Sequence, residues 1–276
     1  MSSEGPLRAM TYLAPGIPLA FFEQVTRYLG AAVGREVVLE SDERISGPMH
    51  GDPDPFSTGR ADMGFLCSPS YLYLRAQAQP SVELLPVGFV FRDARNQGSP
   101  SYFSDVIVRK ERGISHLEEL KSGVFGFNDS CSLSGYFAVR KELAERGLTN
   151  GFFRAETCTG SHADSIRAVL SGEIDVAAID SNALALAQLD FEALDQRIAV
   201  IESFGPHPIQ PIVLSTRLAC ELGEPLRQAL LAMMEDREVA AALNRFGLES
   251  CVPIDDSLYA EERAALEELG QLGSCC

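Results

Sequence analysis

The sequence lacks both a long apolar run and a basic surface. No stretch of about 18 apolar residues occurs in its 276 residues, so we expect no membrane span. Lys and Arg total 23 against 39 Asp and Glu, giving a net charge of −16. This balance argues against nucleic acid as a partner, because phosphate backbones are bound through clustered basic side chains. It does not exclude a small anionic ligand, because backbone N–H groups can bind an anion at close range, where the net charge of the chain is largely screened.

Paired cysteines and an export leader are also missing. The seven cysteines show no C-x-x-C spacing, so neither a zinc site nor a thioredoxin-like motif is indicated, and we expect no metal and no cofactor. A chain of this size does not need disulfides, which favours reduced thiols. The start Met1-Ser-Ser-Glu-Gly-Pro has no basic and apolar leader. We expect a periplasmic protein if a leader has been removed, and a cytoplasmic one as the sequence is written.

The short motifs of common enzyme classes are absent as well. We find no G-x-S-x-G, H-E-x-x-H, P-loop or G-x-G-x-x-G, which favours a non-catalytic protein. An enzyme is the first alternative, with Cys131 or Ser132 as nucleophile and His162 as base. The second is a sensor of arsenite or another soft ligand, if Cys67, Cys131 and Cys158 converge rather than serve as small buried side chains. Cys275 and Cys276 are expected to carry no site.

What the sequence does contain is an alternation of strand and helix patterns. This alternation predicts an α/β fold with mixed, mostly parallel sheets in two lobes. We assign residues 1–98 to lobe 1, 99–206 to lobe 2, and 207–276 to a return into lobe 1 with C-terminal helices. Strands are predicted at 7–13, 37–39, 60–67, 82–90, 105–109, 124–127, 153–157, 174–179, 198–201 and 212–215. Helices are predicted at 19–32, 166–170, from 183, and at 225–235, 237–246 and 260–269, with a loop at 68–71.

The stretch Asn128–Tyr136, N-D-S-C-S-L-S-G-Y, is the most informative. It follows the strand-like run Val124–Phe127 and leads into a helical pattern. Small hydroxyl residues and a glycine at a helix start leave backbone N–H groups pointing forward, at the positive end of the helix dipole. This is the outline of an anion site. The alternative is that Ser130 or Ser132 is only a helix N-cap.

Several segments in order along the chain resemble the phosphonate- and phosphite-binding family of bacterial ABC-transporter solute-binding proteins. The resemblance is densest in Tyr102–Arg109, Ile114–Leu120, Asn128–Tyr136, Thr159–His162 with Ala168–Asp175, and Pro208–Val213. It implies a type II periplasmic-binding fold whose two lobes close on a ligand in the cleft between them. It also implies a small oxyanion as ligand, a permease or a sensor protein as partner, and a monomer.

The resemblance further implies which residues hold the oxyanion. Backbone N–H groups and hydroxyls of Ser132, Leu133, Ser134 and Gly135 would form what we call the anion cradle. A phenol and an imidazole would add donors, and amides would face the ligand where aminophosphonate-binding members carry acids. Amides cannot neutralise an ammonium group, so an aminophosphonate should bind poorly. The predicted ligand-binding residues are Tyr102, Ser132, Leu133, Ser134, Gly135, His162, Asn182, Gln210, Cys67 and Ser68.

One departure from the family falls at Gly51–Gly59. There the family carries a helix with a ligand-facing tyrosine, whereas this sequence has a compact Gly- and Pro-rich segment.

Taken together, the anion-site pattern and the resemblance predict a binding protein for a tetrahedral oxyanion of the phosphonate, phosphite or phosphate class, serving transport or sensing.

Overall fold

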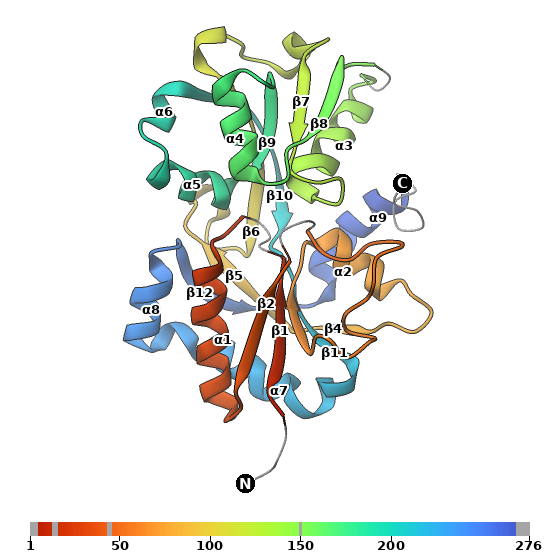
Figure 1. Ribbon diagram of the computed structural model, residues 1–276, viewed down its shortest axis with the longest axis vertical. Helices are drawn as coiled ribbons and strands as arrows, with labels where there is room; N and C mark the ends of the chain where they lie inside the picture. The colour runs from red at the N-terminus through yellow and green to blue at the C-terminus, as the bar shows by residue number, and fades with distance from the viewer. Residues whose placement is uncertain (1–4, 13–15, 43–45, 149–150, 269–276) are drawn as a thin grey trace. The chain divides into compact units, whose positions relative to one another are not determined.

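The computed structural model describes residues 5–12, 16–42, 46–148 and 151–268 (Figure 1). The chain forms two compact units. Unit 1 contains the chain up to Asp42, Ser46–Ser101 and the chain from Pro208 onward, and unit 2 contains Tyr102–His207. Each unit has its own sheet and its own buried residues, and each is described by itself below.

The main sheet of unit 1 has five strands in the order β2, β1, β3, β11, β4. Strand β1 runs parallel to β2 and to β3, whereas β11 is antiparallel to β3 and to β4. A separate antiparallel pair joins β5 and β12. The strands of unit 1 are β1 Leu7–Thr11, β2 Val37–Ser41, β3 Met63–Phe65, β4 Val82–Leu84, β5 Val87–Phe91, β11 Ile212–Ser215 and β12 Leu248–Pro253.

An aromatic cluster holds the first helix of unit 1, α1, to the strands. Along α1 the buried side chains recur at helical spacing, so one face is apolar. Phe21 meets Phe89 of β5 at 5.5 Å between ring centroids, and Phe22 meets Phe65 of β3 at 5.0 Å. The helices of unit 1 are α1 Leu19–Val33, α2 Ser68–Arg75, η1 Ala94–Asn96, α7 Thr216–Ala232, η5 Met233–Glu235, α8 Arg237–Asn244, η6 Asp256–Tyr259 and α9 Ala260–Glu268.

The elements of unit 1 differ from the sequence prediction at prolines. The predicted loop at 68–71 is the first turn of α2, where Pro69 is tolerated because an N–H in that turn has no intrahelical acceptor. The predicted strand 82–90 is two strands separated around Pro86, which has no N–H for a ladder. Helix α7 begins at Thr216 and contains Pro225, at which we predicted a helix start. Strand β12 was not predicted.

The sheet of unit 2 also has five strands, in the order β10, β6, β9, β7, β8. Strand β7 is parallel to β8 and to β9, and β6 is antiparallel to β9. The strands are β6 Ser101–Arg109, β7 Val124–Phe127, β8 Ala155–Cys158, β9 Val176–Asp180 and β10 Ile198–Pro208. The helices are η2 Lys110–Arg112, η3 Leu117–Leu120, η4 Leu133–Phe137, α3 Ala138–Glu145, α4 His162–Ser171, α5 Ser181–Asp190 and α6 Leu194–Arg197.

Both faces of this sheet are buried. Along β6, Val106 and Val108 pack into one core with Val139 of α3, whereas Ile107 between them packs into a second core with Ile166 of α4. This follows from the alternation of side chains along a strand. Helices α3 and α4 therefore cover opposite faces, and the loops that precede both helices lie at the carboxyl ends of β7 and β8. In α/β sheets, ligands bind at this edge.

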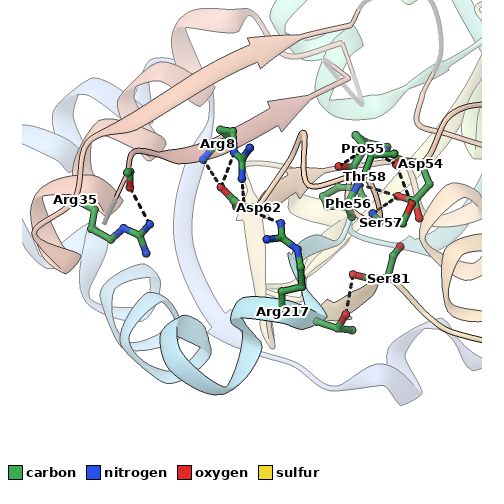
Figure 2. Close-up of polar contacts among 12 residues, drawn as sticks. Arg8, Arg35, Asp54, Pro55, Phe56, Ser57, Thr58, Asp62, Ser81 and Arg217 are labelled. Atoms are coloured by element: carbon green, nitrogen blue, oxygen red, sulfur yellow. Dashed lines mark hydrogen bonds and ion pairs between the residues drawn. The ribbon is translucent and has the colours of Figure 1, made fainter. Parts of the chain in front are cut away.

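A buried ion pair at Asp62 stabilises unit 1 (Figure 2). Asp62 is only 3% exposed; it accepts hydrogen bonds from the backbone N–H of Arg8 at 2.9 Å, from Arg8 Nε at 3.1 Å and from an Arg217 guanidinium nitrogen at 3.0 Å. Burial acts to raise the pKa of Asp62, but the hydrogen bonds and charge of Arg8, with the hydrogen bond from Arg217, outweigh it and lower the pKa. The carboxylate thus ties β1 to the start of β3 and to α7.

We expect Asp62→Ala to lower the free energy of unfolding at pH 7 by about 1–3 kcal/mol, because it removes a buried acceptor whose basic partners are half exposed. A carboxylate with a lowered pKa stabilises the fold above its unfolded pKa, and this contribution is lost as the pH falls. Urea unfolding at pH 7 and pH 3 should therefore show the variant's deficit shrinking in acid. Glu40→Gln, which breaks the exposed ion pair with Arg60, is the matched control and should change little. A deficit unchanged between the two pH values would contradict the assignment.

Candidate functional site

The anion cradle forms the junction between β7 and α3. It begins with the π-helical turn η4, a rare geometry that is frequent at functional sites. Both Tyr136 and Phe137 donate their backbone N–H to the carbonyl of Ser132, at 3.2 and 3.1 Å. The N–H groups of Leu133 and Ser134 precede these bonds in the first turn, so they have no acceptor within the helix. They are the donors that an anion site at this position requires.

Ser132 has the N-cap role that the sequence offered as the alternative. Its Oγ accepts the N–H of Gly135 at 3.1 Å, so the N-cap interpretation is confirmed for this residue. Gly135 itself is packed tightly, because a Cβ at this position would lie 1.8 Å from Asn128 Oδ1 and 3.1 Å from Ser132 Oγ. The cap and the glycine together set the shape of the turn, which is compatible with the cradle.

Two neighbouring elements attach to Ser134. Ser104 of β6 donates its hydroxyl to the carbonyl of Ser134 at 2.6 Å, which fixes the turn against the sheet. His162, the first residue of α4, places Nε2 3.5 Å from Ser134 Oγ. The structure therefore brings His162 against the Ser134 hydroxyl of the cradle. Ser104 was not predicted, although it lies in the segment that carries the resemblance.

The imidazole of His162 is buried, with 5% of the residue exposed. Burial lowers its pKa to about 4, so the ring is neutral at pH 7. A neutral imidazole has one donor and one acceptor nitrogen. Nδ1 has no hydrogen-bond partner among the described residues. His162 is thus a buried uncharged group with one nitrogen available to a ligand.

Tyr102 and Asn182 belong to unit 2 as well. Tyr102 is fully buried on β6, and its ring centroid lies 5.5 Å from that of His207, a residue the sequence analysis missed. Asn182 is the second residue of α5, which Asp180 caps by accepting its N–H at 2.8 Å. Asp180 pairs in register with Ser104, which contacts the cradle. The Asn182 side chain is 4% exposed, and neither amide atom has a hydrogen-bond partner in the described chain.

The other predicted ligand residues, Cys67, Ser68 and Gln210, belong to unit 1 and stay predictions. Cys67 is the N-cap residue of α2, and Ser68 is its fully buried first residue. Gln210 follows β10 and lines a small apolar cavity of about 10 Å³ in unit 1. The Gly51–Gly59 segment forms turns, in which Asp54 accepts the N–H groups of Phe56 and Ser57 at 2.8 and 3.2 Å (Figure 2).

The three cysteines of the soft-ligand alternative are divided between the two units, and that alternative stays a prediction. Cys131 is buried and Cys158 is exposed in unit 2, and Cys67 belongs to unit 1. Cys158 donates its thiol to the carbonyl of Asn128 at 3.3 Å. Among the described residues, no group of three or more His, Cys, Asp or Glu side chains is placed to hold a metal. Cys275 and Cys276 lie outside those residues.

None of the helices described is long and apolar enough to cross a bilayer.

A family model described as "ABC transporter, phosphonate, periplasmic substrate-binding protein" matches residues 19–259.

Solved structures show the same fold at low identity. A binding-protein component of an ABC phosphonate transporter from Pseudomonas aeruginosa is 19% identical, with a TM-score of 0.78 over 97% of this chain and 87% of that chain. A Prochlorococcus marinus protein in complex with methylphosphonate is 15% identical, with a TM-score of 0.76 over 96% and 98%. The aliphatic sulphonate binding protein of Escherichia coli is 13% identical, with a TM-score of 0.65 over 98% and 88%. The predicted α/β fold of the two-lobed, type II periplasmic-binding class is confirmed.

Proposed function

Because this chain belongs to the periplasmic substrate-binding protein family of ABC phosphonate transporters, we propose that it captures a small tetrahedral oxyanion of the phosphonate, phosphite or phosphate class. The family consists of substrate-binding proteins, so the chain is a non-catalytic binding protein, as the sequence predicts. An ABC permease is the partner that the family implies. We propose that the captured oxyanion is passed to such a permease or reported to a sensor protein.

The cradle of unit 2 is the observation that carries this proposal. Its first-turn N–H groups point away from the helix that follows, and the Ser134 hydroxyl and the His162 imidazole meet beside them at 3.5 Å. The positive end of a helix dipole favours an anion at this position. These donors come from η4 and α4, and β6 fixes them through Ser104. Preorganised neutral donors of this kind suit a compact oxyanion.

The substituent on phosphorus is a second part of the proposal. The similar Prochlorococcus marinus protein was solved with methylphosphonate, which makes this compound the first ligand to test. Asn182 and Gln210 are amides, and an amide cannot neutralise an ammonium group. We therefore propose that a small uncharged substituent is accepted and that 2-aminoethylphosphonate binds poorly.

A thermal-shift panel tests the ligand class directly. It compares phosphate, phosphite, methylphosphonate, 2-aminoethylphosphonate, sulfate and arsenite, with and without reductant. A ligand at ~1,000 times its Kd adds about 4 kcal/mol of stability, which such a panel detects. A large shift with one phosphorus oxyanion supports the proposal. A shift with arsenite alone that is lost when the thiols are blocked would instead support the cysteine site.

Variants of the cradle test the site. We expect Ser134→Ala and His162→Ala each to weaken methylphosphonate binding by roughly 10- to 100-fold, because each removes a buried hydrogen-bonding group of the cradle. Isothermal titration calorimetry measures the change, and unliganded melting temperatures report on the fold. Ser165→Ala is the matched control, since Ser165 is a buried serine of α4 that bonds Thr159 at 2.6 Å. Normal binding by both cradle variants would show that the cradle assignment is wrong.

A further inference from the structure

The side chain of Asn128 has a fixed orientation beside the cradle. Asn128 is the first residue after β7, and 8% of it is exposed. Its Nδ2 donates to a carboxylate oxygen of Asp129 at 3.1 Å. An ionised carboxylate only accepts hydrogen bonds, so the nitrogen must be the amide atom that faces Asp129. The amide oxygen, Oδ1, therefore faces the other way.

Oδ1 of Asn128 lies against Gly135 of the cradle. A Cβ on Gly135 would be 1.8 Å from this oxygen, so the oxygen lies directly over the glycine. Two adjacent backbone donors are already used, because Gly135 donates to Ser132 Oγ and Cys131 donates to Asp129 at 2.8 Å. No described group donates to Oδ1. The cradle thus contains a buried acceptor without a donor, next to its own donors.

An unsatisfied buried carbonyl oxygen is costly, and a ligand that brings a donor relieves that cost. A fully deprotonated oxyanion has only acceptor oxygens. One of them would lie against Oδ1, so that two acceptor oxygens would be in contact with no proton between them. An oxyanion that keeps one proton presents an O–H group there while its other oxygens accept from the N–H groups. The carboxylate of Asp129, one residue away, also disfavours a second negative charge on the ligand.

The proposed function places Asn182 against the ligand as well, and on that basis this residue points to the same conclusion. Its carboxamide is 4% exposed, and both its donor and its acceptor atom are without a partner among the described residues. A carboxamide matches a group that offers both an O–H and an anionic oxygen, as a monoprotonated phosphonate does. A sulfonate or a sulfate could accept a hydrogen bond from the amide N–H, but it has no O–H group to donate to the amide oxygen.

We infer that the cradle selects a phosphorus oxyanion in its singly protonated, monoanionic form, with Asn128 Oδ1 as the acceptor of the retained proton. This inference rests on the proposed function and narrows it. Sulfonates and sulfate carry no proton at neutral pH, so the site discriminates against them although their size and shape are similar. Asn128 is then a specificity-determining residue of the binding protein.

The test compares methylphosphonate with methanesulfonate by calorimetry on the full chain. At pH 6 we expect methylphosphonate to bind roughly 10- to 100-fold more tightly, the range for leaving one buried acceptor unpaired. Above the second ionisation of methylphosphonate, its apparent affinity should fall about tenfold per pH unit, as the monoanion is depleted. The titratable groups around Asn128 are Asp129, Cys131, Cys158 and His162. A Cys158→Ser background removes the exposed thiol, so that the titration can extend to about pH 9, well above the second ionisation of methylphosphonate.

Asn128→Ala should bring the affinity ratio of the two ligands toward one. Asn96→Ala is the matched control, because Asn96 of unit 1 is also buried but both ends of its amide are hydrogen-bonded; it should leave the ratio unchanged. The comparison of the two ligands on the wild-type protein tests the inference even if a variant fails to fold. Equal affinities for the two ligands, or an affinity for methylphosphonate that rises through its second ionisation, would overturn the inference and leave the proposed function intact. Absence of binding by both ligands, together with no thermal shift from phosphite or phosphate, would refute the proposed function and the inference with it.

Discussion

Replacing Gly135 with alanine should reduce oxyanion binding by roughly 100-fold or more, an expected loss of at least about 3 kcal/mol of binding free energy. The new Cβ would lie 1.8 Å from Asn128 Oδ1, so this side chain must shift, and 3.1 Å from Ser132 Oγ, which is tighter than an ordinary contact. We expect the displaced Asn128 side chain to disturb the first turn that carries the N–H groups. The effect comes from crowding, because Gly135 does not have a positive φ angle.

Calorimetry with methylphosphonate measures this loss, and far-UV circular dichroism confirms that the variant is folded. Gly223→Ala is the matched control: Gly223 lies inside α7, and a Cβ there meets no atom within 4 Å. We expect the control to bind normally and to gain about 0.5–1 kcal/mol of stability, since alanine is the better helix former. If Gly135→Ala binds like the wild type, the oxyanion is not held by this turn.

The architecture of unit 2 could be predicted from its sequence because periodicity and position agree. Apolar runs such as Val124–Phe127 are bounded by small polar residues, and the helical pattern after Tyr136 starts where a parallel sheet needs its crossover. The π-helical geometry of η4 could not be predicted. It depends on Ser132 accepting two N–H groups with its carbonyl and one with its hydroxyl, and that choice is made by tertiary packing.

Two of the errors in unit 1 have a common cause. At Pro69 and Pro225 we interpreted a proline as a loop residue or as the start of a helix, which is the usual local signal. Pro69 instead lies in the first turn of α2, where no intrahelical hydrogen bond is lost. Pro225 lies inside α7, where the burial of residues such as Leu226 outweighs the lost hydrogen bond. Strand β12 gave no clear signal, since its burial is only partial along most of its length.

For the site, residue types could be predicted but orientations could not. Hydroxyls, a glycine and a histidine at strand ends indicated an oxyanion, and the structure joins His162 to Ser134. The orientation of the Asn128 amide, by contrast, depends on its contact with Asp129 and on the absence of a Cβ at Gly135. Both contacts are set by the fold, so a sequence pattern cannot distinguish a donor from an acceptor at this position.

A second large effect is expected in unit 1, where α9 carries the buried carboxyl of Glu262. The residue is 7% exposed, and neither of its oxygens has a hydrogen-bond partner with normal geometry among the described residues. Burial raises the pKa of Glu262 to about 8, and the nearby Ser68 hydroxyl of α2 lowers it by a smaller amount. The phenol of Tyr259 is fully buried nearby, and its pKa is raised by burial first and by the charge of Glu262 second. Glu262 is therefore neutral in the folded protein at pH 7.

The pH dependence follows from the sign of this shift. In the unfolded chain the glutamate has a pKa of about 4.3, well below its folded value. A group with a raised folded pKa contributes fully to stability below the unfolded pKa, and its contribution is lost as the pH rises through the folded pKa. The contribution of Glu262 to the free energy of unfolding should thus fall between about pH 4 and pH 8, because its ionisation favours the unfolded chain throughout that range.

Glu262→Gln removes this titration while keeping the shape of the side chain. We expect the free energy of unfolding of the variant to exceed that of the wild type by roughly 3–5 kcal/mol at pH 8.5 and to differ little from it at pH 4. This difference is the free energy that corresponds to the raised pKa of Glu262. Urea unfolding at the two pH values gives the wild-type-minus-variant difference, in which the other titrating groups cancel. Glu261→Gln, an exposed neighbour on the same helix, should leave that difference near zero. A Glu262→Gln difference that is the same at both pH values would show that this carboxyl is not the group that titrates, and that α9 is held on α2 by its apolar contacts alone.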